Sequence, residues 1–154
     1  MSDGPLSFCM VTTFFPPHHF GGDAIYVHRL SDELARRGHR VTVVYAPDAF
    51  LTLGGRPGKA IPLHENVRVV PLEGRLGAVA PTVTHLSGRP ALRARELREV
   101  LGGGGFDVVH FHNVSLVGGP GVLAYGGGIK LYTTHEHWLV CPMHVLWKMN
   151  REPC

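Results

Sequence analysis

Cysteine, charge and long apolar runs are all scarce in this 154-residue chain. Its three cysteines are an odd number, which argues against a disulfide-stabilised scaffold. No stretch approaches the ~18 uninterrupted apolar residues of a membrane-spanning helix. The N-terminus has neither the basic segment nor the apolar run of a signal peptide. With 44% hydrophobic and 18% charged residues, the chain predicts one ordinary globular domain in the cytoplasm.

Three functional motifs are also missing. Gly-x-Gly-x-x-Gly does not follow the first apolar run, which argues against a nicotinamide-dependent dehydrogenase. No Cys-x-x-Cys pair is present, so a metal site at Cys141 and Cys154 is only the alternative to having no metal. Basic residues do not alternate with aromatic ones as in nucleic-acid-binding segments. We therefore expect no nucleic-acid partner.

The net charge of +3 is concentrated in two clusters of basic residues. The first comprises Arg36, Arg37, His39 and Arg40, and the second comprises Arg89, Arg93, Arg95 and Arg98. The favoured interpretation is that both are solvated helix faces. The alternative is contact with phosphate groups or with an anionic membrane surface.

The segments that are present alternate between apolar runs and amphipathic stretches. This order predicts an α/β fold with a Rossmann-like, doubly wound parallel sheet, right-handed crossovers and helices on both faces. Continuous apolar runs are typical of strands buried on both faces. The predicted strands are Leu6–Thr12, His39–Tyr45, Val67–Leu72, Asp107–Phe111 and Lys130–Thr134, and the predicted helices are Asp23–Arg37, Arg89–Leu101 and a short, glycine-interrupted Asn113–Tyr125.

Three other segments have weaker patterns. Ala46–Glu65 is polar and rich in glycine and proline, which predicts a loop. Gly74–Gly88 favours neither helix nor strand. His135–Cys154 has the composition of a loop, with one helical turn around His144–Met149 as an option.

Ligands of open parallel sheets bind at the carboxyl ends of the strands. Three predicted loops rich in His, Asn, Thr and Gly meet at that edge: the loop ending in Gly21-Gly22, the segment His110–Asn113 and the segment Thr133–His137. The paired glycine lets backbone approach a ligand, and the following helix N-terminus offers N–H groups to an anion. A tight turn without a ligand is the alternative for the glycines.

Two histidines lie near the end of the fourth predicted strand. His110 and His112 are two residues apart, so both point to the same face of a regular strand. His110 is expected to be structural and partly buried. His112, nearer the edge, is the better candidate to bind a sugar hydroxyl or stabilise charge, with a structural role as the alternative.

Together, these segments resemble the N-terminal domain of family 4 glycosyltransferases, which have the two-domain GT-B architecture. The resemblance rests on three segments. The first contains Phe15-Pro16-Pro17, Gly21-Gly22 and the helix ending Arg36-Arg37-Gly38-His39-Arg40-Val41, and the second is Phe106-Asp107-Val108-Val109-His110-Phe111-His112. The third is Leu131-Tyr132-Thr133-Thr134-His135-Glu136-His137-Trp138, followed by Cys141-Pro142. It covers most of the chain and is weakest across Ala46–Gly88.

The resemblance implies roles for residues at the ligand edge. Gly21 and Gly22 would face the diphosphate of the sugar donor, and His112 would lie beside the transferred sugar as the catalytic residue. His135, Asn113 and Glu136 would line the same cleft, although many members of the family have aspartate where Glu136 stands. The implied reaction is transfer, with retention, from a nucleotide diphosphate sugar to a glycan, lipid or small-molecule acceptor. It would need no cofactor and no catalytic metal.

One feature departs from the family. Its second, donor-binding domain, with a Glu-x7-Glu element, is not found in residues 1–154, and Cys154 falls in a predicted loop. We therefore expect a single, truncated N-terminal domain that is inactive alone. The alternative is a non-catalytic half that binds the acceptor, recruits a separate donor-binding chain and contacts the inner face of a membrane.

Overall fold

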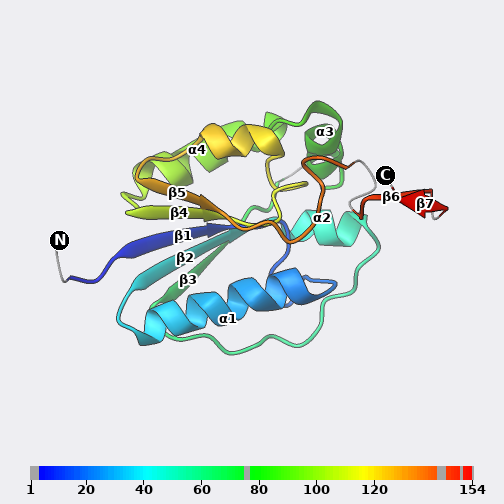
Figure 1. Cartoon of the computed structure of the whole chain (residues 1–154). Helices are drawn as coiled ribbons and strands as arrows, with labels where there is room; N and C mark the ends of the chain where they lie inside the picture. The colour runs from blue at the N-terminus through cyan, green and yellow to red at the C-terminus, as the bar shows by residue number, and fades with distance from the viewer. Residues whose placement is uncertain (1–3, 75–76, 142–144, 150, 154) are drawn as a thin grey trace.

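Five parallel strands form the centre of the structure, a computed structural model that describes residues 4–74, 77–141, 145–149 and 151–153. The order in the sheet is β3-β2-β1-β4-β5, and every pair of neighbours is parallel (Figure 1). This confirms the predicted α/β fold with a Rossmann-like parallel sheet. The strands are β1 (Ser7–Val11), β2 (Arg40–Tyr45), β3 (Val67–Pro71), β4 (Val108–Phe111) and β5 (Ile129–Tyr132).

Helices cover both faces of the sheet, as Figure 1 shows. The side chains of β1 alternate between the faces, so that Met10 packs with Val27 of α1 while Cys9 packs with Leu97 of α4. The helix α1 ends just before Gly38, whose φ of +90° suits a glycine beyond a helix end. The helices are α1 (Gly22–Arg36), α2 (Pro47–Thr52), α3 (Val79–Ser87) and α4 (Ala94–Gly103), with 3₁₀ turns η1 (Ala91–Arg93) and η2 (Pro120–Ala124).

Two predictions about the connections were wrong. The segment predicted as the loop Ala46–Glu65 begins with the helix α2, because Phe50 is buried against Phe14 and Phe20 and fixes this turn to the core. The predicted helix Asn113–Tyr125 is instead an irregular segment that ends in the short turn η2.

Gly119 explains the second difference, because its φ of +60° and ψ of −171° do not fit a helix. The unassigned segment Gly74–Gly88 contains α3.

The end of the chain forms a small hairpin. Its strands are β6 (Trp147–Lys148) and β7 (Glu152–Pro153), which pair antiparallel. The optional helical turn around His144–Met149 is therefore wrong for Trp147–Lys148, because strand pairing takes up that backbone. His144 itself lies outside the described residues.

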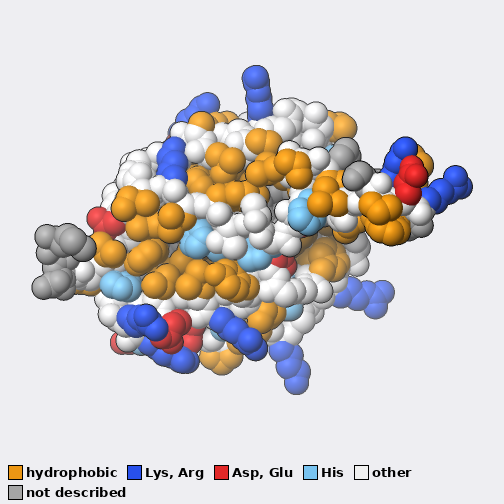
Figure 2. All heavy atoms as spheres, viewed as in Figure 1, with side chains coloured by type: hydrophobic (Ala, Val, Ile, Leu, Met, Phe, Trp, Pro, Cys, Tyr) orange, Lys and Arg blue, Asp and Glu red, His pale blue; other side chains and the backbone are white. Residues whose placement is uncertain are grey.

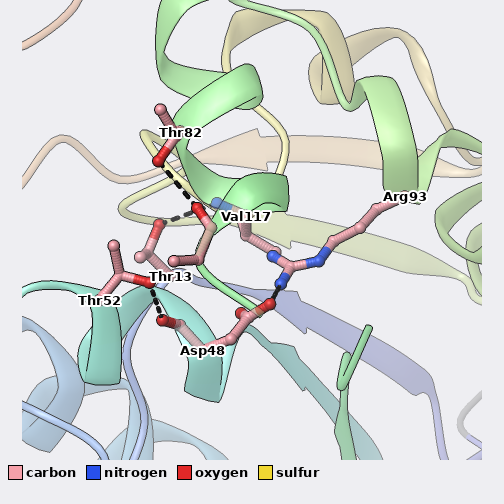
Figure 3. Close-up of polar contacts among 7 residues, drawn as sticks. Thr13, Asp48, Thr52, Thr82, Arg93 and Val117 are labelled. Atoms are coloured by element: carbon pink, nitrogen blue, oxygen red, sulfur yellow. Dashed lines mark hydrogen bonds and ion pairs between the residues drawn. The ribbon is translucent and has the colours of Figure 1, made fainter. Parts of the chain in front are cut away.

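The two basic clusters differ in their surroundings. Arg36 and Arg37 are exposed and form i,i+4 ion pairs with Asp32 and Glu33, as a solvated face would. Arg93 contradicts the solvated interpretation, because its side chain is only 2% exposed. It extends from η1 toward Asp48 of α2 and forms an ion pair with it (Figure 3). This pair attaches α2 to η1, 45 residues later in the sequence.

The edge strand β5 exposes apolar side chains. Ile129 and Leu131 are 63% and 45% exposed. Figure 2 shows hydrophobic side chains in a band across this side of the molecule, with histidines beside them. Among the residues described, no helix combines the length and the apolar character needed to cross a membrane.

Candidate functional site

The ends of β1, β4 and β5 are aligned at the carboxyl edge of the sheet. The backbone N–H of His112 donates to the Val11 carbonyl at 2.9 Å, and that of Thr133 donates to the Phe111 carbonyl at 2.9 Å. Strand pairing therefore continues just beyond β4 and β5. This continuation brings His112 and His135, which come from different loops, beside each other.

Three histidines form a cluster at this edge, with neighbouring rings tilted against each other. The ring centroids of His110 and His112 are 4.1 Å apart, which confirms that both side chains lie on one face of the strand. Nδ1 of His112 lies 3.1 Å from Nε2 of His135. Nε2 of His110 lies 2.8 Å from Oγ1 of Thr133. Polar contacts of this cluster thus join the end of β4 to the residues that follow β5.

His112 is fully buried, with 0% exposure. His110 is half-buried, as predicted. His112 is buried in part because Tyr26 of α1 and His135 lie against its ring, at centroid distances of 6.0 and 5.3 Å. Tyr26 itself is 46% exposed, so it separates His112 from solvent.

Burial also decides the charge of the cluster. It lowers the pKa of His112 to about 3, with smaller contributions from His110 and His135. The pKa of His110 is likewise lowered, first by burial and then by His135. At neutral pH both rings are therefore uncharged, and each has one N–H donor and one acceptor nitrogen.

One nitrogen of His112 remains available. Nε2 is buried and has no hydrogen-bond partner among the residues that the structure describes. A buried N–H without a partner is rarer than an unused acceptor. We therefore assign the proton to Nδ1 of His112, which donates to Nε2 of His135. The lone pair on Nε2 of His112 is then free to accept a hydrogen bond from a hydroxyl.

The paired glycine lies at the start of α1, as predicted. A Cβ added at Gly21 or at Gly22 would meet no atom within 4 Å, so the space in front of this backbone is open. The next residue, Asp23, has a carboxylate that accepts a hydrogen bond from the Ala24 N–H at 2.7 Å. This negative charge already faces the positive end of the helix dipole and opposes an anion at the same point.

Asn113 connects the glycine turn to the strand ends. Its side-chain N–H donates to Asp23 at 3.2 Å, and its side-chain oxygen accepts from the Ser115 hydroxyl at 2.7 Å. It is 8% exposed, so its amide mainly holds two loops together.

Asn113 and Glu136 both line a pocket of about 400 Å³, whose described lining includes neither His112 nor His135. The predicted site residues thus fall into two neighbouring groups: His112 with His135, and Asn113 with Glu136.

The cysteine alternative is only partly described. Cys141 is buried, and its sulfur accepts a hydrogen bond from the Leu146 N–H at 3.3 Å. Cys154 lies outside the described residues. Within the described ranges, no group of three or more His, Cys, Asp and Glu side chains is arranged to hold a metal ion.

Several residues of the site were not singled out from the sequence. Tyr26 gave no signal beyond being an aromatic residue on the exposed side of α1. Leu53, Pro81 and His85 line the pocket but come from segments predicted as a loop or left unassigned. Their contribution depends on how α2 and α3 pack, which no local pattern records.

The open parallel sheet, the glycine turn and the polar strand ends define a Rossmann-like α/β domain whose ligand edge is the carboxyl edge of the sheet. The profile of Glycosyltransferase Family 4 matches residues 20–153. The chain therefore belongs to glycosyltransferase family 4, and its fold is that of the N-terminal domain in the GT-B architecture. No curated protein matches the chain.

Proposed function

We propose that this chain is the acceptor-side domain of a retaining glycosyltransferase. It would act in transfer of a sugar from a nucleotide diphosphate sugar to an acceptor hydroxyl. Family membership supports glycosyl transfer in general. The observation that carries the finer proposal is the buried, neutral His112, whose Nε2 lone pair is unused. Its neighbour in the chain, Asn113, is hydrogen-bonded to Asp23, next to the open glycine turn.

The role of His112 in the proposal is to accept a hydrogen bond from a hydroxyl of the donor sugar. A neutral ring suits this role, because its lowered pKa keeps the acceptor nitrogen unprotonated at neutral pH. His135 fixes the orientation of the ring through the 3.1 Å contact. Because His112 is fully buried, a sugar reaches Nε2 only after a neighbouring side chain moves; in this proposal that side chain is Tyr26, which is 46% exposed and lies against the ring.

The role of Gly21 and Gly22 is to let the donor diphosphate approach the backbone. Side chains at these positions would occupy the open space in front of the turn. Because Asp23 adds negative charge here, positive charge for the leaving diphosphate has to come from a second, donor-binding domain or chain. We therefore propose that transfer requires that second half.

The test is sugar transfer by the protein purified from the cells that make it, with labelled nucleotide sugars as donors. His112→Ala is expected to lower the rate by about tenfold to a hundredfold, since it removes a positioned hydrogen bond at the reacting sugar. His112→Gln keeps an acceptor oxygen and should recover part of the loss. Thermal unfolding of each variant shows whether it is folded.

His64→Ala is the matched control. His64 lies just before β3 at the amino edge of the sheet, where its Nδ1 accepts a hydrogen bond from the Asn66 N–H. Its loss is expected to leave transfer unchanged. Equal rates for wild type and folded His112→Ala would refute the role proposed for His112.

A further inference from the structure

We propose that the pocket beside the histidine cluster binds the acceptor, and that this acceptor is an uncharged molecule with an apolar ring body and a hydroxyl group. The inference rests on the proposed function and specifies its substrate class. The pocket has a volume of about 400 Å³, within the range of sites that hold small ligands. It is formed by the glycine-loop residues, α2, α3 and the strand ends.

One wall of the pocket is aromatic. The rings of Phe14 and Phe20 lie edge to face with centroids 5.4 Å apart. Phe50 supports Phe20 from behind, at 4.5 Å. Phe20 is still 57% exposed, although aromatic side chains are normally buried in the core. A rigid aromatic surface open to the pocket favours a flat ring as its partner.

Other lining residues are aliphatic. Leu53, directly after α2, is 56% exposed, and Pro81 of α3 and the loop residue Leu116 also line the pocket. Apolar side chains in the lining leave water in contact with apolar surface. An apolar ligand displaces that water, which is the main source of affinity in such sites.

Polar side chains enter the pocket from the strand ends. Asn113 and Ser115 come from the loop after β4, and Glu136 comes from the loop after β5. These loops also carry His112 and His135. An acceptor whose ring lies against the apolar lining would therefore place its hydroxyl near these loops, where the sugar is proposed to lie.

Charge excludes phosphorylated and carboxylated acceptors. Among the described residues, no lysine or arginine lines the pocket, and its ionisable side chains are His85 and Glu136. Arg93 pairs with Asp48 and is buried. An anionic acceptor would thus find no lysine or arginine among the described lining residues to offset its charge, which is costly in a partly enclosed site.

Binding of β-naphthol to the chain, measured by calorimetry without any nucleotide sugar, tests the inference. We expect saturable binding that Leu53→Asp weakens about tenfold or more, because the new carboxylate needs water where the ligand sits. Leu51→Asp is the matched control: Leu51 lies in α2, two residues before Leu53, is 52% exposed and is not among the described lining residues. Thr82→Trp, at an exposed position of the lining, should also weaken binding by filling the space.

The alternatives predict different results. Tighter binding of geranyl phosphate would show an anionic lipid acceptor, and tighter binding of cellobiose would show a glycan acceptor; either overturns the inference. The inference is also overturned if Leu53→Asp and Leu51→Asp weaken β-naphthol binding equally, or if the wild type shows no saturable binding. Because the measurement uses no donor, the two failures can be told apart. Saturable β-naphthol binding by a wild-type protein that transfers no sugar would refute the proposed function and leave the pocket as a site for an uncharged ring without the acceptor role.

Discussion

The buried ion pair between Asp48 and Arg93 predicts a large asymmetry between single and double substitutions. Arg93 is 2% and Asp48 11% exposed, and the pair is incompletely hydrogen-bonded. Nε and Nη1 of Arg93 and Oδ1 of Asp48 have no partner in the part of the chain that is described. The attraction between the two ions therefore offsets only part of the free-energy cost of desolvating them.

Removing one partner leaves the other charge buried and alone. For Asp48→Ala, breaking such a pair costs about 3–5 kcal/mol of the free energy of unfolding. Glu96 reduces this cost. Burial raises the pKa of Glu96, whereas the Coulomb interaction with Arg93 lowers it. The Glu96 carboxylate is therefore close enough to offset part of the Arg93 charge when Asp48 is removed. We therefore expect about 3 kcal/mol, the lower end of the range.

Replacing both partners with apolar residues removes the problem. The double variant Asp48→Leu/Arg93→Met is expected to lie within about 1 kcal/mol of wild type, or above it, because well-packed apolar pairs often equal buried ion pairs. The coupling energy of the double-mutant cycle should then be larger than the deviation from additivity that is usual for substitutions at distant sites.

Urea unfolding followed by circular dichroism measures these free energies for wild type, both single variants and the double variant. Arg37→Met is the control, because the Arg37–Glu33 pair is exposed and its loss should not change the unfolding midpoint. An Asp48→Ala cost below about 1 kcal/mol, or a double variant as unstable as the sum of the singles, would refute the reasoning.

Two further predictions concern stability. The pKa of His112 falls from 6.5 to about 3 on folding, so below about pH 6.5 the unfolded chain takes up a proton that the folded protein excludes. The contribution of His112 to the free energy of unfolding is therefore complete above about pH 6.5 and falls by up to about 1.4 kcal/mol per pH unit below it. Unfolding of wild type and His112→Gln at several pH values checks this, and equal slopes would contradict it. Gly119→Ala should lower the free energy of unfolding by about 2 kcal/mol or more, because φ is +60° and the new Cβ would lie 2.6 Å from the Gly88 carbonyl carbon. Gly102→Ala, in open space within α4, should not destabilise the protein, and equal melting of the two variants would exclude the proposed clash.

The sheet and α1 could be predicted because their signals are local. Each buried strand has a continuous apolar run, and the stripe of α1 ends at a glycine. α2 has no such signal: it is six residues long and is fixed by the burial of Phe50 and by the pair with Arg93. Arg93 looked like part of a solvated face because a sequence shows its charged neighbours and not the carboxylate that α2 places opposite it.

The candidate site was predictable in its location and less so in its details. Parallel-sheet topology alone brings the three loops to one edge, and His112 and His135 do meet there. The burial of His112 was not predictable, because Tyr26 reaches it from a helix far away in the sequence. The split between a histidine group and a pocket group likewise depends on how the loops turn after each strand.

The central position of β1 determines when the sheet can be completed. β1 pairs with β2 on one side and with β4 on the other, and the Ser7 N–H donates to the Asp107 carboxylate 100 residues later. During synthesis, β1, α1, β2 and β3 are available long before β4, so one half of the sheet can assemble while the other edge of β1 stays unpaired. The histidine cluster and the pocket both need β4. Since pairing over such sequence distances is slow, we expect the ligand edge to be the last part of this domain to form.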